Sequence, residues 1–294
     1  MKKNFLRKMF CSLVLAATVL TANAADRLLI IGEAVWGGWS IDNSIVMLNS
    51  TENPDVFKAT VNLKANSDFK FLTEADWGKL EYRAGDSNVT LTEGEAATLV
   101  STDENSNDNK FQVAETANYD IVCDLSTKKL TVKKAAYQDA EIKHTALWLI
   151  GGATPGGWEL NKGVKISPKA DNPMVFRGTV DLLAGDMKIA VNKHTGYSQT
   201  FYLRDAADET KMVFGGDDNK WIIAKAGQYD VEADVKNLTI SIKEHTQTGI
   251  NNMETTATAT AEYFTLSGVR LSAPAKGICV KRQGNRVVKT INRK

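Results

Sequence analysis

The sequence predicts an all-β protein, built as two tandem β-sandwich domains followed by a short C-terminal β-hairpin module. Three observations support this fold class. Short apolar segments alternate with turn-rich pieces, one sequence motif occurs twice, and a low-complexity segment separates the repeated part from a final strand-rich stretch. Short strands at this spacing, with few long helical periods, are typical of a β-sandwich.

The repeated motif is rich in glycine and ends in tryptophan. Residues 31–39 read Ile-Gly-Glu-Ala-Val-Trp-Gly-Gly-Trp, and residues 150–158 read Ile-Gly-Gly-Ala-Thr-Pro-Gly-Gly-Trp. The matched positions are Trp39 and Trp158, Pro54 and Pro173, each 119 residues apart, and then Phe111 and Trp221, Tyr119 and Tyr229, each 110 apart. One register on each side of a variable middle indicates two copies of one domain.

In the first copy, placed at residues 26–135, apolar alternation marks the strands. The expected strands are residues 28–31, 56–63, 69–72, 111–113, 119–123 and 130–132. In the second copy, placed at 145–244, they are residues 147–150, 175–182, 187–191, 221–223, 229–233 and 238–242. The segment 136–144 between the copies is short, so we expect the copies to lie close together.

The C-terminal part changes in composition twice. Residues 245–261 include Thr-Thr-Ala-Thr-Ala-Thr and lack an apolar face, which predicts a solvated linker. Residues 262–294 are again strand-like, with turns at Ser267-Gly268 and Gly284-Asn285. About 30 residues are too few for a substantial core, so we interpret this module as one that another protein recognises.

Length and charge limit the function. The chain has 294 residues, 43% of them hydrophobic and 24% charged, which is sufficient for two cores. The net charge of +1 provides no field that would favour a nucleic-acid partner, so none is predicted.

The N-terminus reads as a secretory signal peptide. Four basic residues precede an apolar run at residues 9–20, and Ala22-Asn23-Ala24 fits a small-x-small cleavage site. We predict removal of residues 1–24 and a secreted, cell-surface or outer-membrane location rather than a cytoplasmic one. Cys11 lies inside the apolar run and not at the cleavage point, so lipid attachment there is not expected.

The remaining cysteines and the histidines predict neither a disulfide nor a metal site. Cys123 and Cys279 lie in different segments, so a structural disulfide between them is not expected. The three histidines form no metal-ligand motif, and acidic loops such as Asp217-Asp218 lack calcium-ligand spacing. We therefore predict no metal and no cofactor.

The repeated loop places one tryptophan where a ligand could reach it. Glycines permit the turn, and each loop then presents Trp39 or Trp158. Lys70 lies between Phe69 and Phe71, and strand alternation predicts that it faces away from them and is exposed. The same pattern, Met187-Lys188-Ile189, recurs in the second copy and predicts an exposed Lys188.

Further aromatic and basic residues follow each lysine. They are Trp77 and Arg83 after Lys70, and Tyr197 and Arg204 after Lys188. Exposed aromatic rings beside long hydrogen-bond donors suit a carbohydrate, because a sugar has an apolar C–H face and an edge of hydroxyls. Each ring contact contributes on the order of 1 kcal/mol, so each site should bind weakly alone. Together these eight residues are the predicted glycan site residues.

Two other functions compete with glycan binding. Trp39 and Trp158 could instead fill the core beneath their turns, and Lys70 and Lys188 could simply protect strand edges. The protein would then be a structural spacer or a protein-interaction module of the cell surface. A glycoside hydrolase would need two carboxylates opposed across a cleft, and no catalytic motif accompanies the tryptophan loops. We therefore predict that the chain is not an enzyme.

Residues 150–158, 171–180, 220–229 and 238–243 resemble the domains of the SusE/SusF outer-membrane starch-binding proteins of Bacteroidetes. The resemblance implies immunoglobulin-like β-sandwiches that bind α-glucan without cleaving it. It also implies glucan contacts from Trp158 with Lys188 and from Trp39 with Lys70. The first copy departs from the pattern in carrying Trp36 where the second has Pro155. The family's members are lipoproteins, whereas this chain has no cysteine at its cleavage site.

The C-terminal residues resemble the sorting domains of the type IX secretion system, through Leu266-Ser267-Gly268 and Gly277-Ile278-Cys279-Val280. This resemblance implies passage across the outer membrane and removal of the tail. A small structural hairpin is the alternative. The predicted partners are therefore a polysaccharide or oligosaccharide, with α-glucan first, and an outer-membrane glycan-uptake or secretion machinery.

Overall fold

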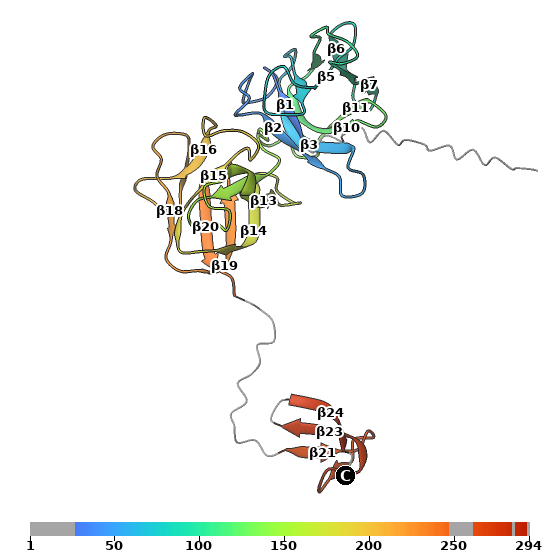
Figure 1. The fold of residues 1–294 in the computed structure, drawn as a ribbon, viewed down its shortest axis with the longest axis vertical. Helices are drawn as coiled ribbons and strands as arrows, with labels where there is room; N and C mark the ends of the chain where they lie inside the picture. The colour runs from blue at the N-terminus through green and yellow to red at the C-terminus, as the bar shows by residue number, and fades with distance from the viewer. Residues whose placement is uncertain (1–26, 247–260, 284–285, 293–294) are drawn as a thin grey trace, which may run out of the picture. The chain divides into compact units, whose positions relative to one another are not determined.

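The computed structural model describes residues 27–246, 261–283 and 286–292 (Figure 1). The predicted signal peptide and most of the predicted linker lie outside the described residues. The chain divides into two compact units, one ending at Glu244 and one beginning at His245. Each unit is described by itself.

The described residues form strands, with a single 3-10 turn at Leu160–Lys162, so the all-β prediction is confirmed. The strands of the first repeat are β1 (Leu28–Ile31), β2 (Ile45–Asn49), β3 (Val56–Leu63), β4 (Lys70–Leu72), β5 (Glu81–Arg83), β6 (Val89–Leu91), β7 (Ala96–Thr98), β8 (Val100–Ser101), β9 (Phe111–Val113), β10 (Ala117–Asp124) and β11 (Lys129–Lys134).

The strands of the first repeat pair in the order β7-β11-β10-β3-β2-β1-β4-β5-β8. Strand β2 joins two layers, because Ile45–Met47 pair with β1 whereas Leu48 and Asn49 pair with β3. Leu28 and Phe71 from one layer and Phe57 and Ile121 from the other lie in one buried apolar cluster. This is the packing of a β-sandwich, with β6 and β9 as an additional parallel pair.

The second repeat has the same plan. Its strands are β12 (Leu147–Ile150), β13 (Val164–Pro168), β14 (Val175–Leu182), β15 (Gly185–Ala190), β16 (Phe201–Arg204), β17 (Met212–Phe214), β18 (Trp221–Ile223), β19 (Gly227–Asp234) and β20 (Thr239–Glu244). They pair in the order β17-β16-β15-β12-β13-β14-β19-β20, with β18 against β15. A second buried cluster contains Leu149, Phe176, Ile189 and Val231.

Strands β1 and β12 are buried on both faces. Leu28 and Ile30 point into the first core, while Leu29 and Ile31 join a third apolar cluster on the opposite face. Trp148 and its neighbours in the second repeat belong to the same third cluster. This packing explains the uninterrupted apolar sequences of both strands, because a strand covered on both sides has no polar face.

The two repeats are also joined by polar and aromatic contacts. Trp36 packs against both repeat cores, with its ring centroid 5.2 Å from that of His144 and 5.3 Å from that of Phe214. Asn192 donates hydrogen bonds to the carbonyl and hydroxyl oxygens of Ser44 at 2.9 and 3.1 Å. The division into two domains stays a prediction, because each repeat has a core of its own but the unit ending at Glu244 also shares a third.

The second unit is a four-stranded sheet in the order β22-β21-β23-β24. Its strands are β21 (Glu262–Phe264), β22 (Arg270–Leu271), β23 (Gly277–Gln283) and β24 (Arg286–Asn292). Cys279 is fully buried in it, whereas Ile278, Val287 and Ile291 are exposed. Cys279 and Cys123 are both free thiols.

The sequence did not predict eight strands of the unit that ends at Glu244. The missed strands are β2, β5, β6, β7, β8, β13, β16 and β17, several of them only two or three residues long. The predicted start of the last strand of the second repeat at Leu238 is wrong, since Leu238 has a φ of +52° and lies in the turn before β20. Lys128 has a φ of +53° in the turn before β11, so both repeats use this turn conformation.

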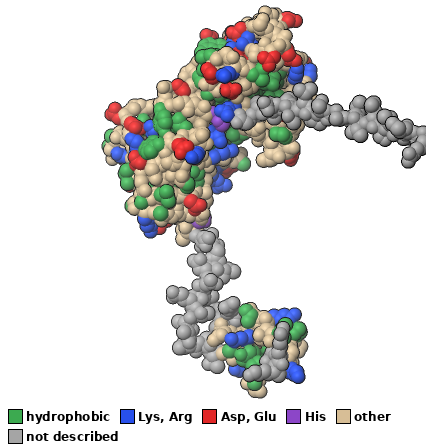
Figure 2. Space-filling model, in the orientation of Figure 1, with side chains coloured by type: hydrophobic (Ala, Val, Ile, Leu, Met, Phe, Trp, Pro, Cys, Tyr) green, Lys and Arg blue, Asp and Glu red, His purple; other side chains and the backbone are tan. Residues whose placement is uncertain are grey.

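On the face drawn in Figure 2, basic and acidic side chains are mixed over the unit that ends at Glu244. Within the described ranges, the search for a membrane-crossing helix finds no helix of sufficient length and hydropathy.

Burial of His144 makes stability depend on pH. Burial, aided by the charge of Lys143, lowers the pKa of His144 from 6.5 to about 3. Between these values the unfolded chain binds a proton that the folded chain does not, so the free energy of unfolding falls as the pH drops below 6.5. From pH 7.5 to pH 5, we expect a loss of about 2 kcal/mol from this group.

Urea unfolding at both pH values measures the effect. We expect His144→Gln to remove about 2 kcal/mol of the pH dependence, whereas His245→Gln, the control, should retain it. Equal pH dependence in the wild type and His144→Gln would contradict the assignment.

Candidate functional site

The two glycine-tryptophan loops, residues 31–39 and 150–158, have the same backbone structure. Gly32 N donates to Gly38 O at 3.0 Å, and Gly151 N donates to Gly157 O at 2.8 Å. The loop of the first repeat therefore keeps its shape although it carries Trp36 in place of Pro155.

Glycine is required where each loop meets the next strand of its sheet. Gly32 has a φ of +142°, and a Cβ there would lie 2.1 Å from the carbonyl oxygen of Asp68. Gly151 has a φ of +135°, and a Cβ would lie 2.3 Å from the carbonyl oxygen of Asp186. Only glycine permits this approach of two backbones. The loop is consequently fixed beside Lys70 or Lys188, which lies two residues after the contacted aspartate.

Both loop tryptophans reach solvent. Trp158 is 37% exposed, and Trp39 is partly buried against the apolar cluster between the repeats. The indole rings of Trp39 and Trp158 therefore do not serve only as core residues beneath their turns. Trp36 is also partly buried, but its ring packs against the cores of both repeats, so the two tryptophans of the first loop differ in environment.

The prediction that Lys70 and Lys188 are exposed is wrong. They are only 5% and 7% exposed, because aromatic rings cover their ammonium groups. Lys70 Nζ lies 5.9 Å from the ring centroid of Trp39 and 5.3 Å from that of Trp77. Lys188 Nζ lies 5.8 Å from the ring centroid of Trp158. Each lysine therefore supports an indole from beneath, in a cation–π arrangement.

We call Trp39, Lys70, Trp77 and Lys110 the first aromatic cluster. Lys70 Nζ forms ion pairs with Glu81 at 2.7 Å and with Asp108 at 3.1 Å. Lys110 Nζ lies 5.7 Å from the centroid of Trp39 and pairs with Asp108 at 2.9 Å. Trp77 is 47% exposed, so the cluster presents a second indole to solvent.

We call Trp158, Lys188, Tyr197, Phe201 and Lys220 the second aromatic cluster. Lys188 Nζ lies 5.6 Å from the ring of Tyr197 and 3.9 Å from that of Phe201. Lys220 Nζ lies 5.6 Å from the ring of Trp158. Tyr197 is 51% exposed, and its hydroxyl donates a hydrogen bond to the carbonyl oxygen of Trp158. The tyrosine thus extends the aromatic surface that Trp158 begins.

One carboxylate in each cluster links the two lysines. Asp218 accepts hydrogen bonds from Lys188 and Lys220, both at 2.9 Å, as Asp108 does from Lys70 at 3.1 Å. Partial burial works to raise the pKa of each aspartate, but the lysine hydrogen bonds and charges outweigh it and hold the pKa below its usual value. Both carboxylates therefore remain ionised at neutral pH.

Sequence reasoning missed these aspartates and the second lysine of each cluster. The signal was present, since Asp-Asn-Lys occurs at residues 108–110 and again at 218–220, directly before the core residues Phe111 and Trp221. The recurrence alone does not show that the aspartate of this turn contacts the strand lysine, because that contact forms only in the folded chain.

The two predicted arginines brace the loops rather than face outward. Arg83 Nη1 donates to the carbonyl oxygens of Ser106 and Asn107, and its Nε donates to Glu81 at 2.8 Å. Arg204 Nε donates to the carbonyl oxygen of Lys220 at 2.9 Å, and its Nη1 donates to the carbonyl of Asp205 at 2.8 Å. Each arginine therefore holds the segment that carries the Asp-Asn-Lys sequence.

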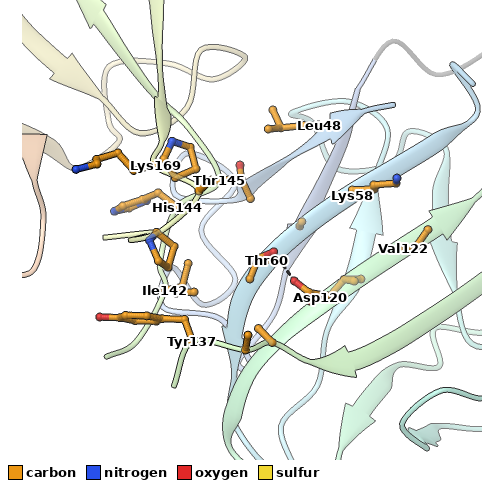
Figure 3. A pocket seen from close by; sticks show the side chains of 17 residues that line it. Leu48, Lys58, Thr60, Asp120, Val122, Tyr137, Ile142, His144, Thr145 and Lys169 are labelled. Atoms are coloured by element: carbon orange, nitrogen blue, oxygen red, sulfur yellow. Dashed lines mark hydrogen bonds between the residues drawn. The ribbon is translucent and has the colours of Figure 1, made fainter. Parts of the chain in front are cut away.

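The unit that ends at Glu244 has a cavity beside the second aromatic cluster and a larger one elsewhere. A cavity of about 390 Å³ adjoins the second aromatic cluster, with Trp158, Tyr197, Lys193 and Arg27 among its lining residues. A larger one, of about 510 Å³, is lined from both repeats and contains none of the cluster residues. Figure 3 shows Tyr137 and His144 on one side of it and Thr60 with Asp120 on the other. The larger cavity therefore does not coincide with the predicted glycan site residues.

Among the described residues, no group of three or more histidine, cysteine, aspartate or glutamate side chains could hold a metal ion. The carboxylates of Asp108 and Asp218 form ion pairs with the lysines of the clusters.

Comparison with known proteins finds one family match. Residues 27–133 match the family model described as SusF/SusE starch specific CBMs, which covers 107 of the 294 residues. The match lies in the first repeat, so the resemblance in the second repeat stays a prediction. A search of curated protein sequences finds no match.

Among solved structures, the chain is similar to the crystal structure of SusF from Bacteroides thetaiotaomicron. The identity is 16% and the TM-score 0.31, over 87% of this chain and 57% of that one. The chain therefore spans little more than half the length of that structure.

The buried Lys70–Glu81 pair predicts a measurable stability difference. Glu81→Ala should lower the free energy of unfolding by about 3 kcal/mol, because it leaves the buried ammonium with only an exposed partner. Asp108→Ala should cost about 1 kcal/mol or less, since Asp108 is solvent-exposed. Urea denaturation compares the two.

A double variant separates loss of charge from loss of packing. Lys70→Met combined with Glu81→Leu should recover most of the stability lost in Glu81→Ala, because no buried charge is left unpaired. A Glu81→Ala protein no less stable than Asp108→Ala would show that Glu81 does not neutralise Lys70.

Proposed function

We propose that this chain is a non-catalytic, secreted or surface-exposed glycan-binding protein, and that its ligand is a starch-like α-glucan. The observation that carries the proposal is that one constellation is assembled twice. In each repeat an indole lies over the ammonium of a strand lysine, a second lysine lies over the same ring, and one aspartate joins the two lysines.

This arrangement suits a sugar ring. The outer face of the indole offers an apolar surface to sugar C–H groups, while the partly exposed second lysine, Lys110 or Lys220, can donate to hydroxyls. The aspartate accepts hydrogen bonds from the lysines and neutralises part of their charge, so the surface suits a neutral polyol better than a polyanion. The starch named in the family description for residues 27–133 supports α-glucan as the ligand.

The acidic residues support binding rather than hydrolysis. A glycosidase needs a carboxylic acid whose pKa is raised so that it can donate a proton. Lysines instead hold the pKa of Asp108 and of Asp218 below its usual value. The carboxylates of the clusters are therefore suited to organising lysines and not to general acid catalysis.

Exposure of Trp158 favours binding over a spacer role. A spacer would gain nothing from a half-exposed indole covering a buried lysine, whereas a glycan site requires that surface. Two weak sites on one chain also gain avidity when both reach the same polymer.

Affinity electrophoresis in amylopectin gels tests the proposal. We expect the wild type to be retarded, and each of Trp39→Ala and Trp158→Ala to weaken binding by about threefold to tenfold, as for the loss of one aromatic contact. The double variant should migrate as in a gel without polysaccharide. Tyr137→Ala serves as the matched control, because it removes a half-buried aromatic ring that lines the other cavity. An unretarded wild-type protein would reject the α-glucan proposal.

We also infer that residues 262–294 direct export and are then removed. The compact four-stranded sheet of this unit, with several exposed apolar side chains, supports a segment recognised by another protein. Mass spectrometry of the extracellular protein should give a chain that begins at Ala25 and lacks this unit. An extracellular chain that ends at Lys294 would support the structural hairpin instead.

A further inference from the structure

Tyr197, whose hydroxyl donates to the carbonyl oxygen of Trp158, lies on a loop whose ends belong to the second repeat but whose anchor belongs to the first. This loop, residues 191–200, connects β15 to β16 and carries Tyr197. Gln199 braces it internally, because its Oε1 accepts hydrogen bonds from the backbone N–H groups of Val191 and Asn192, both at 2.9 Å. Gln199 Nε2 donates to the carbonyl oxygens of Asn192 and Gly196 at 2.7 and 3.0 Å.

Residues 42–44 of the first repeat hold the loop from outside. Asp42 Oδ1 accepts a hydrogen bond from the backbone N–H of Gly196 at 3.1 Å, and Asp42 O accepts one from the hydroxyl of Thr195 at 3.2 Å. Asn43 Oδ1 accepts a hydrogen bond from the N–H of Thr200 at 2.8 Å. The contacts of Asp42 are therefore to residues one and two positions before Tyr197.

The corresponding loop of the first repeat is closed by a contact within itself. Residues 73–80 connect β4 to β5 and carry Trp77, and the loop closes on itself through Thr73, whose hydroxyl donates to the carbonyl oxygen of Leu80 at 2.7 Å. The two aromatic clusters thus fix their second ring by different means.

Arg27 adds a second link between the first repeat and the second cluster. It lines the cavity of about 390 Å³ together with Trp158, Lys193 and Tyr197. A ligand lying on Trp158 and filling this cavity would touch both repeats.

We propose that the second glycan site is shared between the repeats, with Asp42 of the first repeat as the positioning residue for Tyr197. The carboxylate holds the N–H of Gly196, and this fixes the tyrosine ring beside Trp158 and over Lys188 before any ligand arrives. Preorganisation of this kind strengthens binding because less freedom is lost when the ligand binds. That the site binds a glycan rests on the proposed function. That Asp42 positions Tyr197 does not, and it can be tested without a ligand.

The structural arm needs no ligand. In amide hydrogen exchange, Asp42→Ala should lose protection in the peptide spanning residues 193–200. Asp42→Asn retains an oxygen acceptor at the same place and should keep that protection. Glu95→Ala removes an exposed acidic side chain elsewhere in the first repeat and should leave the peptide unchanged. Equal protection in Asp42→Ala and the wild type would overturn the positioning role, whatever the protein binds.

The binding arm uses proteins with one site silenced. In a Trp39→Ala background, titration with a soluble α-1,4-linked malto-oligosaccharide should show about threefold to tenfold weaker binding when Asp42→Ala is added, and recovery with Asp42→Asn. In a Trp158→Ala background, Asp42→Ala should change binding by less than about twofold, because Tyr197 is not part of the first cluster.

The outcomes separate the two proposals. Equal losses in both backgrounds would overturn the positioning role, since Asp42 would then act through general stability or through Trp39. If the wild type binds no malto-oligosaccharide while the exchange result holds, the α-glucan function fails and the anchoring of the Tyr197 loop stands.

Discussion

A buried lysine ammonium beneath an exposed indole is the constraint on which both clusters depend. Lys70 and Lys188 occupy the outer face of a sheet strand, where a charged group is stable only with a partner. Asp108 and Asp218 provide that partner from the turn before β9 or β18, and a second lysine on the same turn covers the other side of the aspartate. The positions of the indole, the strand lysine and this turn therefore depend on one another.

The two repeats stabilise the buried lysine ammonium group in different ways. In the first, Glu81 on β5 adds a second carboxylate at 2.7 Å from Lys70. In the second, Phe201 on β16 places an aromatic ring 3.9 Å from Lys188. The register explains the exchange, because Glu81 pairs with Leu72 as Phe201 pairs with Ala190, two residues after the respective lysine. Phe201 also joins the apolar cluster between the repeats, where a carboxylate would be costly.

The shared apolar cluster brings the second aromatic cluster into contact with the first repeat. Because the outer faces of β1 and β12 are buried in one cluster, the unit ending at Glu244 has three cores instead of two. The loop of residues 191–200 lies at this junction and donates hydrogen bonds to the side-chain oxygens of Asp42 and Asn43. The aromatic surface of the second cluster is consequently linked to the turn that follows Trp39.

The sequence by itself determined the all-β class, the duplication, most of the longer strands, and the presence of a loop tryptophan near a strand lysine in each repeat. These features depend on local period and on matched spacing, which need no knowledge of distant contacts. Only the tertiary structure decided that Lys70 and Lys188 are buried, that Asp108 and Asp218 join them, and that Trp36 packs between the repeats while Trp39 reaches solvent. Asp108 lies 38 positions from Lys70 and Asp218 lies 30 from Lys188, and strand alternation specifies the face of a side chain but not what covers it.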